Sequence, residues 1–472
     1  MKRKTKIVAT LGPASADPDN IKSLIKAGVN VFRLNFSHGS AEDHQQHVSN
    51  IRTVAAELGE LVGILQDLQG PKIRVGQFPG GPVMLRDGAA FNLFPEGTHA
   101  GDETGVGISY PNLYQDVQSG DRLLLDDGKL TLEVTAVADQ IIQTRIIRGG
   151  LLSDKKGINV PDADLSIAAV TEKDIADIAT GARLDVDWVA LSFVRNKDDL
   201  LLARKYLAQN NSTAKLMAKI EKPGAIRNYK HILKAADGIM VARGDLGVEL
   251  SAEKVPMLQK RLIRKAREKG KPVITATQML ETMTEHPIPT RAEANDVANA
   301  IFDGTDAVML SAETATGKHP VQAVATMDRI AKTVESDSDY KRRMRERKFK
   351  AEKNTPDAVS SAACNIATTL SAAVMCCFSS SGATALRVAR NRIHTDIIAI
   401  SPSIKSCHQL TVSWGVNPVL NHDATSSDEM VEIASQVIKN HHMANAGDHF
   451  VVTAGVPFGQ SGTTNLIRVE TL

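Results

Sequence analysis

The sequence has little cysteine, almost no net charge and no long apolar run. Its four cysteines lie in the last quarter of the chain without C-x-x-C spacing, and they are Cys364, Cys376, Cys377 and Cys407. The adjacent pair falls in an apolar run, which predicts a reduced, buried strand. A formal net charge of +2 gives no reason to expect nucleic acid or an anionic membrane as a partner. No segment reaches the roughly 18 apolar residues of a spanning helix, and the apolar start is too short for a signal peptide, so we expect a soluble, cytoplasmic protein.

The chain is otherwise of ordinary globular composition, and it is too long for one hydrophobic core. It has 472 residues, of which 42% are hydrophobic and 23% charged. Short β-rich runs recur along it, each followed by a segment of helix length. These runs are residues 6–10, 30–36, 62–67, 188–194, 215–220, 238–242, 272–277 and 307–311. Such units favour a parallel βα architecture, because parallel strands need crossover connections that are usually helical.

One long interruption breaks this rhythm, between residues 71 and 170. Its glycines, prolines and alternating segments predict a small all-β domain inserted as a lid after the third strand. The flanking parts, residues 1–70 and 171–345, together approach the roughly 250 residues of a (β/α)₈ TIM barrel. Residues 341–350 are strongly basic and are interpreted as a solvated helix and linker. Residues 346–472 return to an alternating α/β pattern, which predicts a third, doubly wound domain.

Polar side chains share one face at the C-terminal ends of several apolar runs. Successive side chains of a strand point to opposite faces, so each polar set is separated from its apolar neighbours. The sets are Arg33, Asn35 and Ser37 on the second run, Lys219 and Glu221 on the fifth, and Thr275 and Thr277 on the seventh. Barrel active sites lie at this end of the strands. Polar groups directed at the barrel axis are costly unless a ligand or an ion meets them.

Two carboxylates and two cations stand out in this region. Glu221 and Asp245 would hold one Mg²⁺, which prefers oxygen ligands and keeps room for substrate oxygens. Arg33 and Lys219 would meet phosphate oxygens, and phosphoryl transfer needs mainly such positioning and charge stabilisation. The residues alone leave two alternatives open, a buried Lys219–Glu221 ion pair and a turn role for Asp245.

Two further groups are interpreted as structural. Thr290 and Glu293 fit a capping box at the start of a helix. His38, His44 and His47 match no known metal-ligand spacing, and we expect them on the surface.

In their order and spacing, the motifs of this chain resemble the pyruvate kinase family from end to end. The residues that carry the resemblance are 6–13 (KIVATLGP), 33–39 (RLNFSHG), 67–74 (DLQGPKIR), 156–157 (KG), 218–221 (AKIE), 240–247 (MVARGDLG), 275–279 (TATQM), 289–293 (PTRAE) and 309–313 (MLSAE). The resemblance implies a (β/α)₈ barrel with an inserted small β-barrel and a C-terminal effector-binding domain. It also implies a homotetramer that transfers the phosphoryl group of phosphoenolpyruvate to ADP in glycolysis, with Mg²⁺, or Mn²⁺ in its place, as cofactor.

The resemblance further implies roles for individual residues. Lys219 stabilises the phosphoryl group in transfer, and the metal ligands are Glu221 and Asp245. The groups that hold phosphoenolpyruvate correspond to Arg33, Gly244, Asp245 and Thr277. Thr277 also lies near the route by which a proton reaches the enolate carbon, and the residues that support this route are Ser311 and Glu313. The nucleotide contacts correspond to Pro13, His38, Arg74 and Lys156.

One departure from the family concerns potassium. Potassium-dependent relatives have Glu where this chain has Lys72, whereas their K⁺-binding residues are retained here as Asn35, Ser37 and Asp67. A fixed ammonium would place one positive charge near the same oxygens. We therefore expect activity without K⁺.

The last domain resembles the family's effector-binding domain. Its expected phosphate loop consists of Ser379, Ser380, Ser381, Gly382, Ala383 and Thr384, and it precedes a helix whose N–H groups attract anions. Ala383 stands where many members have Arg, which argues against a bisphosphate. We expect a sugar monophosphate or AMP as the allosteric ligand.

Two other functions compete with this interpretation. A Mg²⁺-dependent pyruvate or enolpyruvate aldolase uses a similar barrel, but it leaves Lys219, Lys156 and the inserted domain without a role. A non-enzymatic metabolite sensor would draw support from the basic residues 341–350, but every catalytic position of the family is intact.

Overall fold

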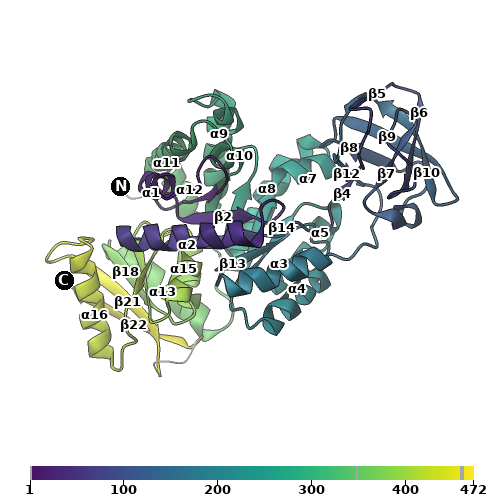
Figure 1. The fold of residues 1–472 in the computed structure, drawn as a ribbon. Helices are drawn as coiled ribbons and strands as arrows, with labels where there is room; N and C mark the ends of the chain where they lie inside the picture. The colour runs from purple at the N-terminus through teal and green to yellow at the C-terminus, as the bar shows by residue number, and fades with distance from the viewer. Residues whose placement is uncertain (1–2, 347–348, 458–461) are drawn as a thin grey trace.

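Eight parallel strands close into a barrel at the centre of the molecule (Figure 1). The computed structural model describes residues 3–346, 349–457 and 462–472. The barrel strands are β1 (Lys6–Thr10), β2 (Val31–Asn35), β3 (Gly63–Asp67), β13 (Trp188–Leu191), β14 (Lys215–Ile220), β15 (Gly238–Ala242), β16 (Val273–Ala276) and β17 (Ala307–Leu310). β1 pairs with both β2 and β17, which closes the ring. The fold class expected from the sequence is confirmed.

Helices surround the barrel and bury its outer face. The longer ones are α1 (Pro18–Ala27), α2 (Ala41–Leu58), α3 (Glu172–Arg183), α4 (Lys197–Gln209), α8 (Val255–Glu268), α9 (Arg291–Asp303), α11 (Pro320–Ser336) and α12 (Ser338–Glu346). The shorter ones are α6 (Tyr229–Ala235) and three helices that follow strands near the barrel mouth, α5 (Pro223–Arg227), α7 (Arg243–Glu249) and α10 (Ala312–Ala315). α9 begins at the predicted capping box, in which Thr290 accepts from the Glu293 backbone and Glu293 accepts from the Thr290 backbone. Among the described residues, no helix is both long and apolar enough to cross a membrane.

The lid is a barrel-like sheet with its own hydrophobic core. Its strands are β4 (Ile73–Arg74), β5 (Val83–Leu85), β6 (Ala90–Pro95), β7 (Gly105–Ile108), β8 (Arg122–Leu125), β9 (Leu130–Ala138), β10 (Ile141–Arg148), β11 (Gly150–Leu152) and β12 (Gly157–Asn159). Seven of them form one sheet in the order β4-β12-β8-β9-β10-β6-β7. A bridge between Val75 and Ile108 brings the two edges of this sheet together. Large buried side chains such as Phe91 and Leu132 fill the interior.

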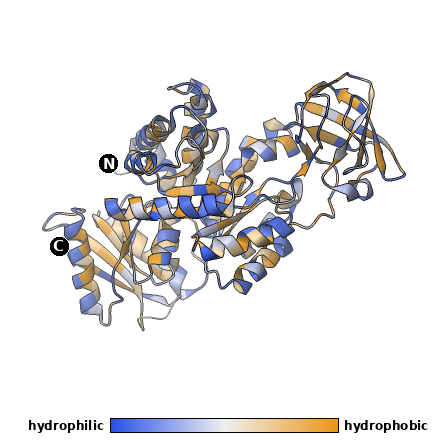
Figure 2. Cartoon of the chain, in the orientation of Figure 1, coloured by the Kyte–Doolittle hydropathy of each residue, from blue (hydrophilic) through white to orange (hydrophobic). Residues whose placement is uncertain are grey.

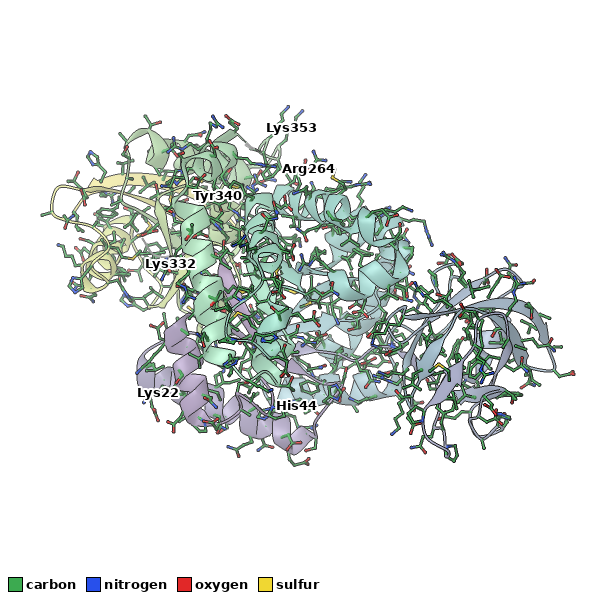
Figure 3. The ribbon with its side chains drawn as sticks, turned by 90° about the horizontal axis from the view of Figure 1, so that it is seen from above. Lys22, His44, Arg264, Lys332, Tyr340 and Lys353 are labelled. Atoms are coloured by element: carbon green, nitrogen blue, oxygen red, sulfur yellow. The ribbon has the colours of Figure 1, made fainter. Side chains whose placement is uncertain are left out.

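The C-terminal part is a five-stranded α/β layer at the opposite end of the molecule from the lid. Its sheet has the order β20 (Val416–Leu420), β19 (Asp396–Ser401), β18 (Val374–Phe378), β21 (His449–Gly455) and β22 (Thr464–Thr471). Its helices are α13 (Thr355–Thr369), α14 (Ala383–Ala389), α15 (Ile404–Leu410) and α16 (Ser427–Asn440). The strands are largely hydrophobic, whereas the helices present both kinds of residue (Figure 2). Seen from above, the barrel separates this layer from the lid (Figure 3).

The C-terminal layer is joined to the bottom of the barrel by buried ionic contacts. Asp306, just before β17, accepts a hydrogen bond from the Trp414 backbone at 3.1 Å and pairs with the buried Arg392 at 3.1 Å. Trp188 donates its indole N–H to the Gln409 carbonyl at 3.0 Å. Because buried ion pairs tolerate little rearrangement, these contacts hold the two parts in one orientation.

Two details differ from the sequence-based expectation. His44 is buried and its ring stacks on Phe36 with centroids 3.8 Å apart, so the surface location expected for it is wrong. The basic residues from position 341 begin within α12, where Tyr340 and Met344 are buried, and residues 347–348 lie outside the described part of the chain. The expectation for the adjacent cysteines is confirmed, because Cys376 and Cys377 lie in β18 as free, buried thiols.

Lys6 makes this junction sensitive to pH. Its ammonium is buried beneath the barrel and donates to the Val416 carbonyl at 2.7 Å. Burial, reinforced by the charge of Arg3, lowers the pKa of Lys6 to about 7. An unfolded lysine keeps its proton up to a pH of about 10. Between these values the unfolded chain holds one more proton, so stability rises with pH by up to about 1.4 kcal/mol per unit.

We therefore expect the Lys6→Met variant to lose this rise in stability between pH 7.5 and 9.5. Urea unfolding followed by tryptophan fluorescence measures it, because both tryptophans, Trp188 and Trp414, are buried at this junction. Lys230→Met removes an exposed lysine from α6 and should keep the wild-type slope. Equal slopes for the Lys6→Met variant and the wild type would contradict the assignment.

Candidate active site

The side chains that point into the barrel change from apolar to charged near its mouth, within two residues along each strand. Apolar side chains line the inside below the mouth, among them Val31, Leu65, Ala190 and Met217. Two residues further along the same strands, or just beyond them, the chain has Arg33, Asp67, Ser192 and Lys219. Since alternate side chains of a strand share a face, these four groups lie together above the apolar layer.

Asp67 is the hub of this charged layer. Its Oδ2 accepts from Arg33 Nε at 2.6 Å, and its Oδ1 lies 3.1 Å from Lys219 Nζ. Ser192 accepts from Lys219 Nζ at 2.6 Å and donates to the Leu68 carbonyl at 2.7 Å. Burial alone would raise the pKa of Asp67, but Lys219 and Arg33 hold it below its ordinary value. Asp67 therefore stays ionised between two cations.

Glu221 lies beside the same ammonium and is fully buried. Its Oε2 accepts from the Phe193 backbone N–H at 2.7 Å, and its Oε1 lies 3.1 Å from Lys219 Nζ in an ion pair without hydrogen-bond geometry. Burial raises the pKa of Glu221, although Lys219 opposes this rise. Burial also disfavours the charge of Lys219, but Asp67 and Glu221 raise its pKa above the ordinary lysine value.

Asp245 lies in the first turn of α7, directly beyond β15. It is near enough to Lys219 and Glu221 to act electrostatically on both. Among the described residues, no group of three or more His, Cys, Asp or Glu side chains is placed to hold a metal. Two carboxylates with additional oxygens from substrate and water form the donor set that Mg²⁺ prefers, so Glu221 and Asp245 fit this ion.

Thr277 reaches the site by leaving the strand. Ile274 and Ala276 face the barrel interior, and Thr275 faces outward, where it bonds Thr305 at 3.0 Å. The expectation that Thr275 and Thr277 share a face is therefore wrong. Thr277 follows the end of β16 with a left-handed φ of 66°, and its hydroxyl accepts from the Gly244 N–H at 2.8 Å. A non-glycine residue pays for such a conformation, which is typical of functional sites.

Arg243, which was not among the residues predicted from the sequence, holds this strained turn in place. Its guanidinium donates to the Thr277 carbonyl at 2.6 Å and to the Gln278 carbonyl at 3.1 Å. It also pairs with Asp296 of α9 at 2.6 Å. No local sequence pattern around Arg243 indicates this role. Ser192, also missed, had a signal, because it is the single polar residue of the apolar run 188–194.

Ser311 and Glu313 follow β17 at the same end of the barrel. The buried carboxylate of Glu313 accepts from the Ser311 N–H at 2.6 Å and from the Leu280 N–H at 3.1 Å. Burial raises the pKa of Glu313. The pair thus braces the loop that follows β16.

The expected nucleotide residues come from two different parts of the molecule. Pro13 and His38 are exposed on barrel loops. Arg74 and Lys156 are on the lid, where Arg74 donates to the Lys155 carbonyl at 3.0 Å and Lys156 pairs with Asp126 at 2.8 Å. Arg74 pairs with Gly157 across β4 and β12, so Arg74 and Lys156 lie together at one place on the lid.

The expected monovalent-cation residues lie at one place on the barrel mouth, because Asn35 pairs with Asp67 across β2 and β3. Asn35 Oδ1 accepts from the Ser37 N–H at 3.2 Å, whereas Asp67 is engaged by Arg33 and Lys219. Lys72 lies where the chain enters the lid, and its side chain packs against Gly157 and lines a cavity of about 270 Å³ between lid and barrel.

The expected effector loop precedes α14. Gly382 has a φ of 78° and caps this helix. The Ser380 carbonyl accepts from the Ser406 hydroxyl of α15 at 2.6 Å, and the Thr384 hydroxyl is buried 2.7 Å from that of Thr464. Ser379 and Ser381 are partly exposed.

The fold and the charged mouth place the protein among (β/α)₈-barrel enzymes with a lid domain. Comparison with known proteins narrows the class. A family model described as the barrel domain of pyruvate kinase matches residues 2–324, and one for its alpha/beta domain matches residues 357–470. The chain belongs to the pyruvate kinase family.

Individual relatives agree over the full length. Pyruvate kinase 2 of Synechocystis is 48% identical over 99% of this chain and 79% of its own length. The pyruvate kinase of Methylorubrum extorquens is 44% identical over 99% of this chain and 97% of its own. A solved pyruvate kinase structure from Cryptosporidium parvum superposes with a TM-score of 0.93 at 33% identity, covering 99% and 96% of the two chains. An aldolase or a non-enzymatic sensor is not favoured by these matches.

Proposed function

We propose that the chain transfers the phosphoryl group of phosphoenolpyruvate to ADP, and that the residues at the barrel mouth divide this task. The observation that carries the proposal is the convergence of Arg33, Lys219, Asp67 and Glu221 within one network of buried ion pairs. During transfer the bond from phosphorus to the enolate oxygen breaks, and a β-phosphate oxygen of ADP forms the new bond. The enolate left behind takes a proton at its terminal carbon and becomes pyruvate.

Each group has a distinct part. Lys219 supplies a fixed positive charge to the phosphoryl oxygens, and Arg33 binds the same anion from β2. Glu221 and Asp245 would hold Mg²⁺, or Mn²⁺ in its place, which when bound neutralises the substrate's carboxylate and phosphate oxygens. The Gly244 N–H and Thr277 orient the substrate, with Thr277 near the proton's route.

Supporting groups complete the proposed site. Ser311 and Glu313 keep the loop after β16 in position for proton delivery. Pro13, His38, Arg74 and Lys156 would contact the nucleotide when the lid approaches the barrel, which excludes water that competes with ADP.

The division of the chain also remains a prediction: residues 1–70 and 171–345 as catalytic barrel, 71–170 as lid and 346–472 as effector-binding domain. We place the protein in the cytoplasm as a homotetramer, as the family implies. Exposed apolar side chains on the barrel, Met257 at 69% and Ile288 at 71% exposure, are suitable for such contacts.

Replacing Lys219 tests the proposed transfer. Wild-type protein with phosphoenolpyruvate, ADP and Mg²⁺ should form ATP, and Lys219→Met should lower kcat by about 100- to 1,000-fold or more, since one stabilising charge is lost. Lys215→Met, at the opposite end of the same strand, serves as the matched control and should keep kcat. Undiminished ATP formation by Lys219→Met would exclude the proposed role.

We further propose that Lys72 replaces the monovalent cation. Lys72 follows the Gly70 turn at the lid hinge, so a change in lid angle moves its ammonium relative to Asn35, Ser37 and Asp67. Turnover in tetramethylammonium buffer should be within about twofold of that in K⁺, because the ammonium supplies the one charge that K⁺ would supply. Lys72→Glu should create a K⁺ requirement. Near-zero wild-type turnover without K⁺ would show that the proposal is wrong.

The loop before α14 is our proposed effector site for a sugar monophosphate or AMP. Partly exposed Ser379 and Ser381 offer hydroxyls for a phosphate, together with Ser380, the Gly382 turn and Thr384. Ser381→Asp should abolish activation by glucose 6-phosphate or AMP through charge repulsion while leaving unactivated turnover intact, and Ser381→Ala should only weaken activation. Thr384→Asp should act likewise but also disturb the buried contact with Thr464. Full activation of Ser381→Asp would place the effector elsewhere.

A further inference from the structure

A second buried ionic cluster lies behind the active site, at the lid hinge. Lys222 directly follows Glu221, and its ammonium forms an ion pair with Glu249 Oε1. Asn159 donates its side-chain N–H to the same oxygen at 2.7 Å. The Glu249 side chain is fully buried, and its second oxygen has no hydrogen-bond partner among the described residues. The Lys222 ammonium also lies over the Phe193 ring, 5.7 Å from its centroid.

These three side chains belong to three elements with different tasks. Asn159 is the last residue of β12, the final strand of the lid. Glu249 is the last residue of α7, whose first turn contains Gly244 and Asp245. Lys222 begins the segment after Glu221. One carboxylate thus joins the lid to both elements that carry the proposed metal ligands, through hydrogen bonds that involve charged groups and are strong when buried.

A second lid contact falls on the same helix. A methyl group placed at Gly128 would lie 3.5 Å from Val248 Cγ1, so the lid turn at Asp126–Gly128 lies against α7. Asp126 of this turn pairs with Lys156 and donates its N–H to the Gly157 carbonyl at 3.2 Å. The orientation of the lid on α7 therefore also determines the location of Lys156, the proposed nucleotide contact.

We propose that Asn159, Glu249 and Lys222 form the pivot on which the lid turns, and that they are positioning residues for ADP. The proposal rests on the proposed transfer to ADP. The pivot keeps the last lid strand attached to α7 while the lid angle changes, so that Lys156 approaches the nucleotide along a fixed path. Phosphoenolpyruvate is held by barrel groups that do not depend on the lid. Weakening the pivot should therefore impair ADP binding much more than phosphoenolpyruvate binding.

The Asn159→Ala variant tests this division. The KM for ADP should rise about tenfold, the size expected for one lost hydrogen bond to a charged group, while the KM for phosphoenolpyruvate should stay within about twofold. Hydrogen exchange of the backbone amides in residues 157–160 should become faster. Asn92→Ala, which removes an asparagine from a lid strand without a role at the pivot, should change neither KM.

Two variants of Lys222 keep the test decisive where Asn159→Ala folds poorly. Lys222→Arg retains the charge, so both KM values should stay near those of the wild type. Lys222→Gln removes the charge and should raise the KM for ADP. Unchanged KM values in Asn159→Ala and Lys222→Gln, with ATP formation by the wild type intact, would overturn the pivot but not the transfer. A parallel rise in both KM values would likewise overturn it, because it indicates general loss of structure. A wild type that forms no ATP would instead refute the transfer itself.

Discussion

The rest of the site depends on the carboxylate of Asp67, which separates and neutralises two buried cations. Arg33 from β2 and Lys219 from β14 point into the same small volume, where their mutual repulsion would be costly in a low-dielectric interior. Asp67 contacts both within about 3 Å, at 2.6 Å and 3.1 Å, and stays ionised. The cations can therefore keep their charge in the absence of substrate, and an arriving anion meets preorganised groups rather than groups that must first be reoriented.

The barrel that carries these preorganised charges is rigid, and it includes one strained turn at the site. The apolar layer beneath the charged groups and the ionic junction with the C-terminal layer fix the barrel. The left-handed Thr277, held by Arg243, places a hydroxyl and the Gly244 N–H beside the mouth. The lid, by contrast, meets the barrel through the buried Glu249 cluster and through the exposed Arg227–Asp164 ion pair. The proposed lid movement would therefore act on a site that is otherwise fixed.

Much of this arrangement could be predicted from the sequence, because strand alternation is a local property. The β1, β14 and β15 strands have the bounds expected from their apolar runs, and the inward direction of Lys219 follows from β14. β2 is one residue shorter at each end than expected, but its alternation is unchanged, so Arg33 also points inward. The predictions from strand alternation were wrong where the backbone leaves regular strand geometry. Residues 188–194 were expected to form one strand, but β13 ends at Leu191, and Phe193, with a φ of 55°, turns its N–H toward Glu221. Thr275 was assigned to the wrong face for the same reason, and the roles of Arg243 and Asn159 depend on contacts distant in sequence.

The most direct test of this account is a crystal structure with Mg²⁺ and oxalate, which mimics the enolate of pyruvate. We expect an ion with Glu221 and Asp245 as ligands at about 2.0–2.1 Å, with the Lys219 ammonium facing the open side where the phosphoryl group would lie. An ion bound at Asp67 or away from the barrel mouth, with Glu221 still paired only to Lys219, would contradict it.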